Sequence, residues 1–289
     1  MPTAWPELPY DSWHATRDTL HGHTQVLGKL AAALAPPEPQ LQHAALRLSA
    51  RGWETAALPA PDGSGALAVA LDLHTYEAVV EHSDGRVRRI PLTPDRSVGE
   101  VTRDLLAAVR ALVGPVELSL KPQETPWTTP LDSDEEHAAF DTARVDAYFS
   151  AATRAALVLG ALRAPYRGRA SPVNAWWGSF DLAVSLFSGK PAEPPGDDFI
   201  MRNAGNAEQI EVGWWPGDHR YPRAAFFAFA YLSIGDRDHA MEWVERAVQM
   251  KSFVVRSLMA WDNPWLSALR DDPRYVALRK KVLATTFKS

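Results

Sequence analysis

The stretch that most constrains this chain is Asn174–Phe187, the densest apolar run in its middle. Within it, Trp177, Ser179 and Asp181 alternate with other residues that are mostly apolar, and a period of two is typical of a β-strand. We therefore expect a buried strand with one aromatic and aliphatic face and one mixed face. Ser179 and Asp181 would then share a face of that strand.

Asp181 needs an explanation, because burying a carboxylate without partners is costly. It is either held by structural hydrogen bonds or part of a site. A second aromatic block, Gly213–Gly217, follows and includes Trp215. The chain has 11 tryptophans, and such side chains fill either a bulky core or an aromatic ligand cleft. Both interpretations stay open for Trp177 and Trp215.

Composition excludes several classes of protein. The 289 residues are 46% hydrophobic, which allows one large domain or two ordinary ones. A net charge of -5 argues against nucleic-acid binding, which needs clustered cations. The absence of cysteine excludes disulfides, thiolate metal sites and cysteine nucleophiles. No signal peptide is evident and no apolar run approaches the ~20 residues that span a bilayer, so we expect a cytoplasmic protein without membrane contact.

The residue patterns predict an α+β fold, with an antiparallel sheet and two long packing helices. Apolar residues at helical spacing predict one long helix that ends before the proline pair at 36–37, and another over about 142–164. A shorter helix is expected over 98–113. Short alternating runs between residues 42 and 92 predict a β-meander, in which Asp84-Gly85 suits a tight hairpin turn. Further strands are expected over 116–120 and 208–214.

Three polar residues of the first predicted helix share one of its faces. His21, Gln25 and Lys29 stand at positions i, i+4 and i+8. They either contact an anionic or polar ligand or belong to a solvated face. Gly22 and Gly28 each cost helix stability, so each marks a place where another element packs closely.

Familiar catalytic and metal-binding motifs are missing. The chain has neither a Gly-rich phosphate loop nor a serine nucleophile elbow. His14, His21 and His23 do not share one helical face, and the acidic run 131–137 suits a solvated loop better than a cation site. We therefore expect no metal and no cofactor. A hydrolytic triad of Ser179, Asp181 and His21 can be drawn, but the sequence gives it no particular support.

The chain resembles a bacterial family, DUF5996, over about residues 5–231. The segments that carry the resemblance are Trp5–Pro9, Thr19–His21, Thr24–Lys29, Ser49–Gly52, Ser171–Val173, Trp177–Ala183, Phe187–Gly189 and Trp215–Gly217. The Trp177–Ala183 segment is the most specific of them. The resemblance implies one α+β domain of unknown function, and it implies no activity, cofactor or substrate.

Beyond Tyr231 the chain resembles a tetratricopeptide repeat, so residues 232–289 are expected to form an α-helical repeat-like hairpin. Small residues at Ala240 and Ala247 and the turn Gly235-Asp236 stand at the repeat's positions. One repeat cannot bury a face alone, so this tail should pack on the first domain or on another protein. Residues 224–231 suit both a strand and the repeat's first helix, with a slight preference for the strand.

Two functional hypotheses remain. The first is a ligand- or partner-binding domain, residues 1–231, with an aromatic pocket and a helical tail that contacts proteins. The second is a small-molecule enzyme, for example a hydrolase, with a cleft between the first helix and Trp176–Phe187. The enzyme cleft would join His21, Gln25 and Lys29 to Ser179 and Asp181. The predicted binding site comprises His21, Gln25, Lys29, Trp177, Ser179, Asp181 and Trp215.

Overall fold

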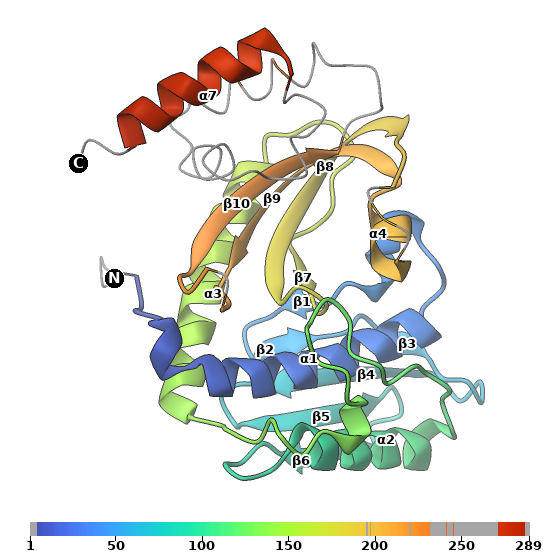
Figure 1. Ribbon diagram of the computed structural model, residues 1–289. Helices are drawn as coiled ribbons and strands as arrows, with labels where there is room; N and C mark the ends of the chain where they lie inside the picture. Colours follow the sequence, from blue (N-terminus) through green and yellow to red (C-terminus); the bar gives the residue numbers. More distant parts are fainter. Residues whose placement is uncertain are drawn as a thin grey trace.

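The computed structural model describes residues 5–194, 196, 198–219, 221–231, 241, 245 and 271–286. Within these residues the chain is a mixed α+β protein with two antiparallel sheets, which confirms the α+β class but not the rest of the predicted architecture. Figure 1 shows the two sheets one above the other, with a helix crossing between them. The single sheet expected from the sequence is thus divided in two.

The first sheet comes from the N-terminal half. Its strand order is β1-β2-β4-β5-β6, and β3 also pairs with β4. A hairpin at Asp84-Gly85 joins β5 to β6, and Gly85 has a φ of 93° there, which suits glycine. The strands are β1 (Arg47–Leu48), β2 (Gly52–Glu54), β3 (Leu58–Pro59), β4 (Ala66–Asp72), β5 (Glu77–His82) and β6 (Val87–Pro91).

Two helices pack around this sheet. Helix α1 (His14–Leu34) ends just before the proline pair, and its residues 19–31 are all buried. Helix α2 (Val98–Val113) begins with a capping box, in which Ser97 and Glu100 bond each other's backbone N–H groups. It packs on α1, β5 and β6. A polar face of α1 is therefore buried together with its apolar residues, which requires internal partners for each polar side chain.

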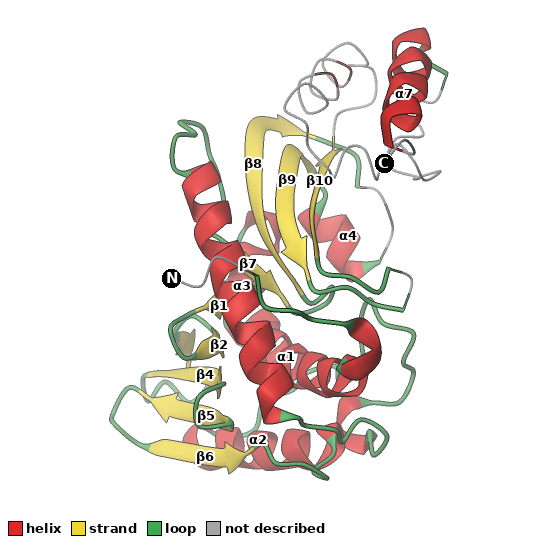
Figure 2. Cartoon of the chain, turned by 90° about the vertical axis from the view of Figure 1, so that its left-hand side faces the viewer, coloured by secondary structure: helices red, strands yellow, loops and turns green. Residues whose placement is uncertain are grey.

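The second sheet has the strand order β10-β9-β8-β7 and all its pairs are antiparallel. Helix α3 (Thr142–Arg163) lies along one face of it, as Figure 2 shows. The strands are β7 (Asn174–Trp176), β8 (Asp181–Pro191), β9 (Ala207–Trp215) and β10 (Ala225–Tyr231). Residues 225–231 are thus a strand, which settles the ambiguity between strand and helix.

Helix α3 requires a correction to the expectation about membrane-length segments. In the described part of the chain it is the helix that is long and apolar enough to cross a membrane by length and composition, with a mean hydropathy of 1.2. However, 39% of that segment is buried within the protein, where it packs on β8 and β9. Length and composition alone therefore do not distinguish a membrane span from a helix that packs in a protein core.

Two predicted strands also need correction. Asn174–Phe187 is not one strand but β7, a tight loop (Trp177–Phe180) and the first part of β8. Phe180 has a φ of 59°, and this left-handed residue turns the chain back on itself. Val116–Leu120 is not a strand, although Leu120 O accepts a hydrogen bond from Leu131 N. Periodicity cannot reveal either outcome, because it carries no information on pairing.

Shorter elements complete the described structure. They are η1 (Tyr10–Ser12), η2 (Pro39–Ala44), η3 (Leu131–Ser133), α4 (Phe199–Ala204) and α7 (Pro273–Thr286). The repeat-like hairpin predicted after Tyr231 falls almost wholly outside the described residues.

Candidate functional site

The face of the second sheet that points away from α3 forms the floor of a cavity. Side chains alternate between the faces of a sheet, and the strand register sets Ala183 beside Gly213 and Ser185 beside Glu211. Even-numbered neighbours such as Leu182 and Trp214 join the core on the other face. The odd-numbered floor residues are Asp181, Ser185, Gln209, Glu211, Trp215, Phe227 and Phe229.

The cavity has a volume of about 900 Å³. Its walls come from the first half of α1, η2, α4, the loop after β9 and a proline-rich loop over residues 121–130. Of the wall residues, those with polar or aromatic side chains are Tyr10, Arg17, Asp18, His21, Gln40, Gln42, Glu124, Thr125, Trp127, Trp176, Trp177, Ser179, Asp218 and His219. The site is thus assembled from segments that are distant in sequence.

His21 holds the β7–β8 loop in position. Its Nε2 lies 2.9 Å from the carbonyl oxygen of Trp177 and 3.0 Å from that of Gly178. Carbonyl oxygens only accept, so Nε2 carries the proton and donates to both. Burial, followed by the charge of Arg17, lowers the pKa of His21 to about 3. The imidazole therefore remains neutral at physiological pH and anchors the backbone of the loop.

Trp177 is fixed against α1 by close packing. A Cβ placed on Gly28 would lie 1.9 Å from Trp177 Cδ1, so only glycine fits below the ring. Trp177 Nε1 donates to Ala44 O at 3.0 Å. Lys29 Nζ lies 5.3 Å from the ring centroid, within cation–π range. The close packing expected at Gly28 is thus a contact with the loop that carries Ser179.

Gln25 joins α1 to the proline-rich loop. Its Nε2 donates to Gln123 O and its Oε1 accepts from Gln123 N, both at 2.9 Å. These paired bonds fix the backbone next to Glu124. A Cβ on Gly178 would lie 2.2 Å from Glu124 Oε2, so this carboxylate rests directly on the β7–β8 loop.

Phe180 forms the other side of the β7–β8 loop and packs into the core. Its ring stacks on His21, Trp53 and Tyr148 at centroid distances of 5.0, 5.3 and 5.2 Å. The Arg17 guanidinium lies 5.6 Å from the same ring. This aromatic stack compensates for the left-handed backbone of Phe180, and it fixes the residues on either side of it at the cavity wall.

Three carboxyl groups face the cavity close enough to perturb one another. Burial raises the pKa of Asp181 to about 7, although Ser179 Oγ donates a hydrogen bond to it. Burial and the charge of Asp181 raise the pKa of Glu211 to about 8. Glu124 is more open to the cavity, yet withdrawal from bulk water and the charges of Asp181 and Asp198 raise its pKa to about 7.

The electrostatic balance of the cavity wall is acidic. Asp181 and Glu211 accept hydrogen bonds from serine hydroxyls, the latter from Ser185 Oγ at 2.8 Å. The described cavity wall contains one arginine, Arg17, and its guanidinium pairs with Asp18 at 2.5 Å. The described part of the wall contains no other arginine or lysine, and burial is the main cause of the raised pKa values of the three carboxyl groups.

The geometry does not assemble the hydrolytic triad. Ser179 Oγ donates to Asp181 rather than to an imidazole. His21 Nε2 is occupied by two backbone carbonyls, and its buried Nδ1 has no hydrogen-bond partner in the described structure. A serine nucleophile needs a base that takes its proton, and His21 does not contact Ser179 in that way.

Another serine–histidine–aspartate group joins two loops of the first sheet. Ser64 Oγ lies 3.1 Å from His82 Nε2, and His82 Nδ1 lies 2.9 Å from Asp84 Oδ1. Ser64 Oγ donates its own proton to Asp62 at 2.6 Å, so His82 Nε2 must donate to Ser64. In a catalytic triad the serine hydroxyl donates its proton to the histidine, whereas here the histidine donates to the serine. The group therefore joins the two loops and does not activate a nucleophile.

The predicted site residues fall into two sets. Five of them line the cavity: His21, Trp177, Ser179, Asp181 and Trp215. Gln25 and Lys29 do not line it, and they are buried at 0% and 6% exposure, so the polar face of α1 is not solvated. Glu124 and Glu211 were missed. Glu211 has a sequence signal, since it lies among alternating residues of a predicted strand, whereas Glu124 stands in a loop without any periodicity.

Among the described residues, no group of three potential metal-ligand side chains lies close enough to hold an ion. In the acidic run 131–137, Asp134 is buried and accepts a hydrogen bond from His137 Nδ1 at 2.7 Å. The solvated loop expected there is therefore partly internal.

Comparison with known proteins identifies one family. Residues 5–253 match the family described as "Family of unknown function (DUF5996)", so the similarity extends past Tyr231, where it was expected to end. Neither a curated protein nor a solved structure matches the chain.

Proposed function

The chain belongs to DUF5996, a family of unknown function, and from its cavity we propose that it binds a small organic cation. The observation that carries this proposal is the group of three carboxyls with raised pKa values that line the cavity, Asp181, Glu211 and Glu124, without a cationic partner in the described wall. A ligand with an ammonium group supplies the missing positive charge. Charge-assisted hydrogen bonds to carboxylates are among the stronger ones in proteins.

The aromatic part of the cavity favours the same class of ligand. Trp127, Trp176, Trp215, Phe227 and Phe229 all line it. The faces of aromatic rings attract cations, and they also cover the aliphatic part of an amine. Gly213 and Ala183 pair at the middle of the floor, and a Cβ on Gly213 would lie 2.3 Å from the Phe227 ring, so the glycine makes room for that ring. The site therefore suits an amine with an extended apolar body.

Isothermal titration calorimetry with cadaverine tests the proposal, with pentanediol as its neutral counterpart. We expect heat from the diamine alone. Affinity should increase from pH 6 to pH 8, because deprotonation of carboxyls with pKa values of about 7 and 8 creates the charge that the ligand needs. Equal binding of the diol, or no binding of a panel of linear and aromatic amines, would contradict the proposal.

The variant Glu211→Gln separates charge from shape in this experiment. Losing one charge-assisted hydrogen bond costs about 1.5–3 kcal/mol, so we expect the amine affinity to fall by roughly tenfold or more. Glu117→Gln is the matched control, because Glu117 is exposed and lies outside the cavity wall. The amine affinity of the Glu117→Gln variant should equal that of the natural chain.

A small-molecule enzyme is the second candidate, and one observation favours it. A carboxyl group with a pKa near 7 can serve as general acid or base at neutral pH, and the site has such groups in Asp181 and Glu211. Mass spectrometry of a bound amine after prolonged incubation distinguishes the candidates. An unchanged ligand supports binding alone, and a product that Glu211→Gln fails to form supports the enzyme.

We also propose the roles that the sequence suggested for the rest of the chain. Composition and residue pattern support a cytoplasmic, bacterial protein. The residue pattern also supports a division into a domain of residues 1–231 and a tetratricopeptide-like tail of residues 232–289 that contacts another protein. Light scattering on the full chain and on a chain ending at Tyr231 tests contact between copies. A dimer that becomes monomeric on truncation would support it, and equal masses would leave packing on the first domain as the role of the tail.

A further inference from the structure

Exposed apolar side chains gather at the C-terminal end of α3. Leu157 is 70% exposed, Val158 48% and Leu162 43%, and Tyr166 is 38% exposed just beyond the helix. These four residues, here called the apolar tip, are half of the eight large exposed apolar side chains among the described residues. An apolar cluster on a water-exposed surface is typical of an interaction site.

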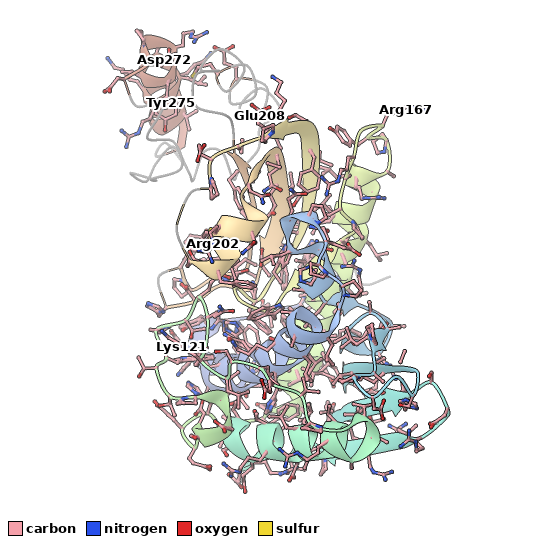
Figure 3. The ribbon with its side chains drawn as sticks, turned by 90° about the vertical axis from the view of Figure 1, so that its right-hand side faces the viewer. Lys121, Arg167, Arg202, Glu208, Asp272 and Tyr275 are labelled. Carbon is pink, nitrogen blue, oxygen red and sulfur yellow. The ribbon has the colours of Figure 1, made fainter. Side chains whose placement is uncertain are left out.

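The same part of the chain is strongly basic. Between Asp146 and Asp181 the sequence contains four arginines and no acidic residue, although the whole chain has a net charge of -5. Arg163 Nε donates to Ser171 O, and Arg169 donates to the amide oxygen of Gln40. These are neutral acceptors, so the bonds orient the two guanidinium groups without cancelling their charge. Figure 3 shows Arg167 at the outer end of this segment.

The apolar tip is held rigidly in its exposed position. Tyr166 Oη donates to Phe187 O at 2.9 Å, which ties the loop after α3 to β8. Arg169 lies 4.5 Å from the ring centroid of Phe187, and Ala170 bridges to Leu186. Figure 2 shows this end of α3 and its loop at an outer edge of the molecule. A fixed apolar surface loses little conformational entropy when it is covered.

We propose that the apolar tip docks on the surface of an anionic lipid bilayer. Leucine and valine side chains enter the boundary between headgroups and acyl chains, a tyrosine lies at headgroup level, and arginines attract anionic lipids. A second copy of the chain fits less well, because a symmetric contact would bring the same arginines of both copies together. The cavity lies on the other face of the second sheet from α3, so docking leaves it accessible.

Vesicle flotation with the full chain tests this proposal. The vesicles are phosphatidylcholine alone, or phosphatidylcholine with phosphatidylserine, at low and high salt. We expect at least tenfold more bound protein on the anionic vesicles, and a loss of most of that binding at high salt, since salt screens the arginines. Equal binding to neutral vesicles, or no binding to anionic ones, would overturn the proposal.

Substitutions locate the surface. Leu157→Ser combined with Leu162→Ser, and separately Arg167→Glu, should each reduce vesicle binding at least tenfold. Val276→Ser on α7 is the control, because Val276 is also exposed on a helix but lies outside the basic segment. The altered side chains are exposed, so thermal midpoints should not change. Unchanged vesicle binding by the double variant, or a dimer in light scattering that this variant abolishes, would overturn the proposal in favour of another surface or a second copy.

Discussion

Single glycines decide how closely neighbouring elements approach α1. Gly22 lies against Val98, where a Cβ would come within 2.7 Å of a methyl group. Gly28 lies under Trp177, whose ring is also fixed by its hydrogen bond to Ala44. The ring cannot retreat without breaking that bond, so Gly28 is a strict requirement of the β7–β8 loop.

Gly28→Ala should therefore destabilise the protein by about 2 kcal/mol or more, because overpacking a filled site strains both partners. Gly160→Ala is the matched control in α3, where the nearest atom to a new Cβ is 4.0 Å away. It should be neutral or stabilising by up to about 1 kcal/mol, as alanine favours helices. Urea unfolding measures both, and a Gly28→Ala protein as stable as Gly160→Ala would contradict this packing.

The carboxyl groups of the cavity show what residue patterns can and cannot reveal. Asp181 was conspicuous because it interrupts an apolar run, and Ser185 and Glu211 interrupt strands in the same way. Their meeting on one face depends on the register between β8 and β9, which a single sequence does not specify. Glu124 was unpredictable, because its place depends on the bonds between Gln25 and Gln123.

At the scale of elements, α1 is a buried helix whose polar side chains form hydrogen bonds to neighbouring loops. His21 holds the β7–β8 loop and Gln25 holds the proline-rich loop, so two walls of the cavity depend on one buried helix. These two loops carry Ser179 and Glu124. The helix thus positions the site even though Gln25 does not reach the cavity itself.

Gln25→Ala should loosen the proline-rich loop. It leaves the backbone N–H and carbonyl of Gln123 without their partner, at a cost of about 1–3 kcal/mol. Hydrogen exchange should accelerate over residues 121–130, and amine affinity should fall with it. Thr24→Ala is the control, since Thr24 Oγ1 donates only within α1, to His21 O. Loop exchange that stays slow in Gln25→Ala would show that other contacts hold this segment.

The elements also show where local patterns suffice. The Asp84-Gly85 turn and the capped helix α2 follow from local chemistry, because each is encoded by adjacent residues. The division into two sheets and the reversal at Phe180 do not, since the period of two continues through the turn. Phe180 adopts its left-handed backbone because tertiary stacking on Trp53 and Tyr148 outweighs local preference.

For the whole molecule, two sets of buried groups give opposite pH dependences. Asp181 and Glu211 have folded pKa values of about 7 and 8, above those of the unfolded chain. Their contribution to stability is complete below about pH 4 and is lost as the pH rises to 8. His21 and His23 have folded pKa values of about 3, below the unfolded value, so their contribution is present above about pH 6.5 and lost as the pH falls.

The ligand-free protein should therefore lose stability as the pH rises from about 6.5 to 8. For each carboxyl that remains protonated only in the folded state, the free energy of unfolding falls by up to about 1.4 kcal/mol for each unit by which the pH rises. Urea unfolding at pH 6.5 and 8 measures the loss, which Glu211→Gln should reduce and Glu117→Gln should not. A bound amine should remove the loss by stabilising the ionised carboxylates, which connects stability to the proposed function. Stability that rises from pH 6.5 to 8 without ligand would mean that the cavity already contains a compensating cation.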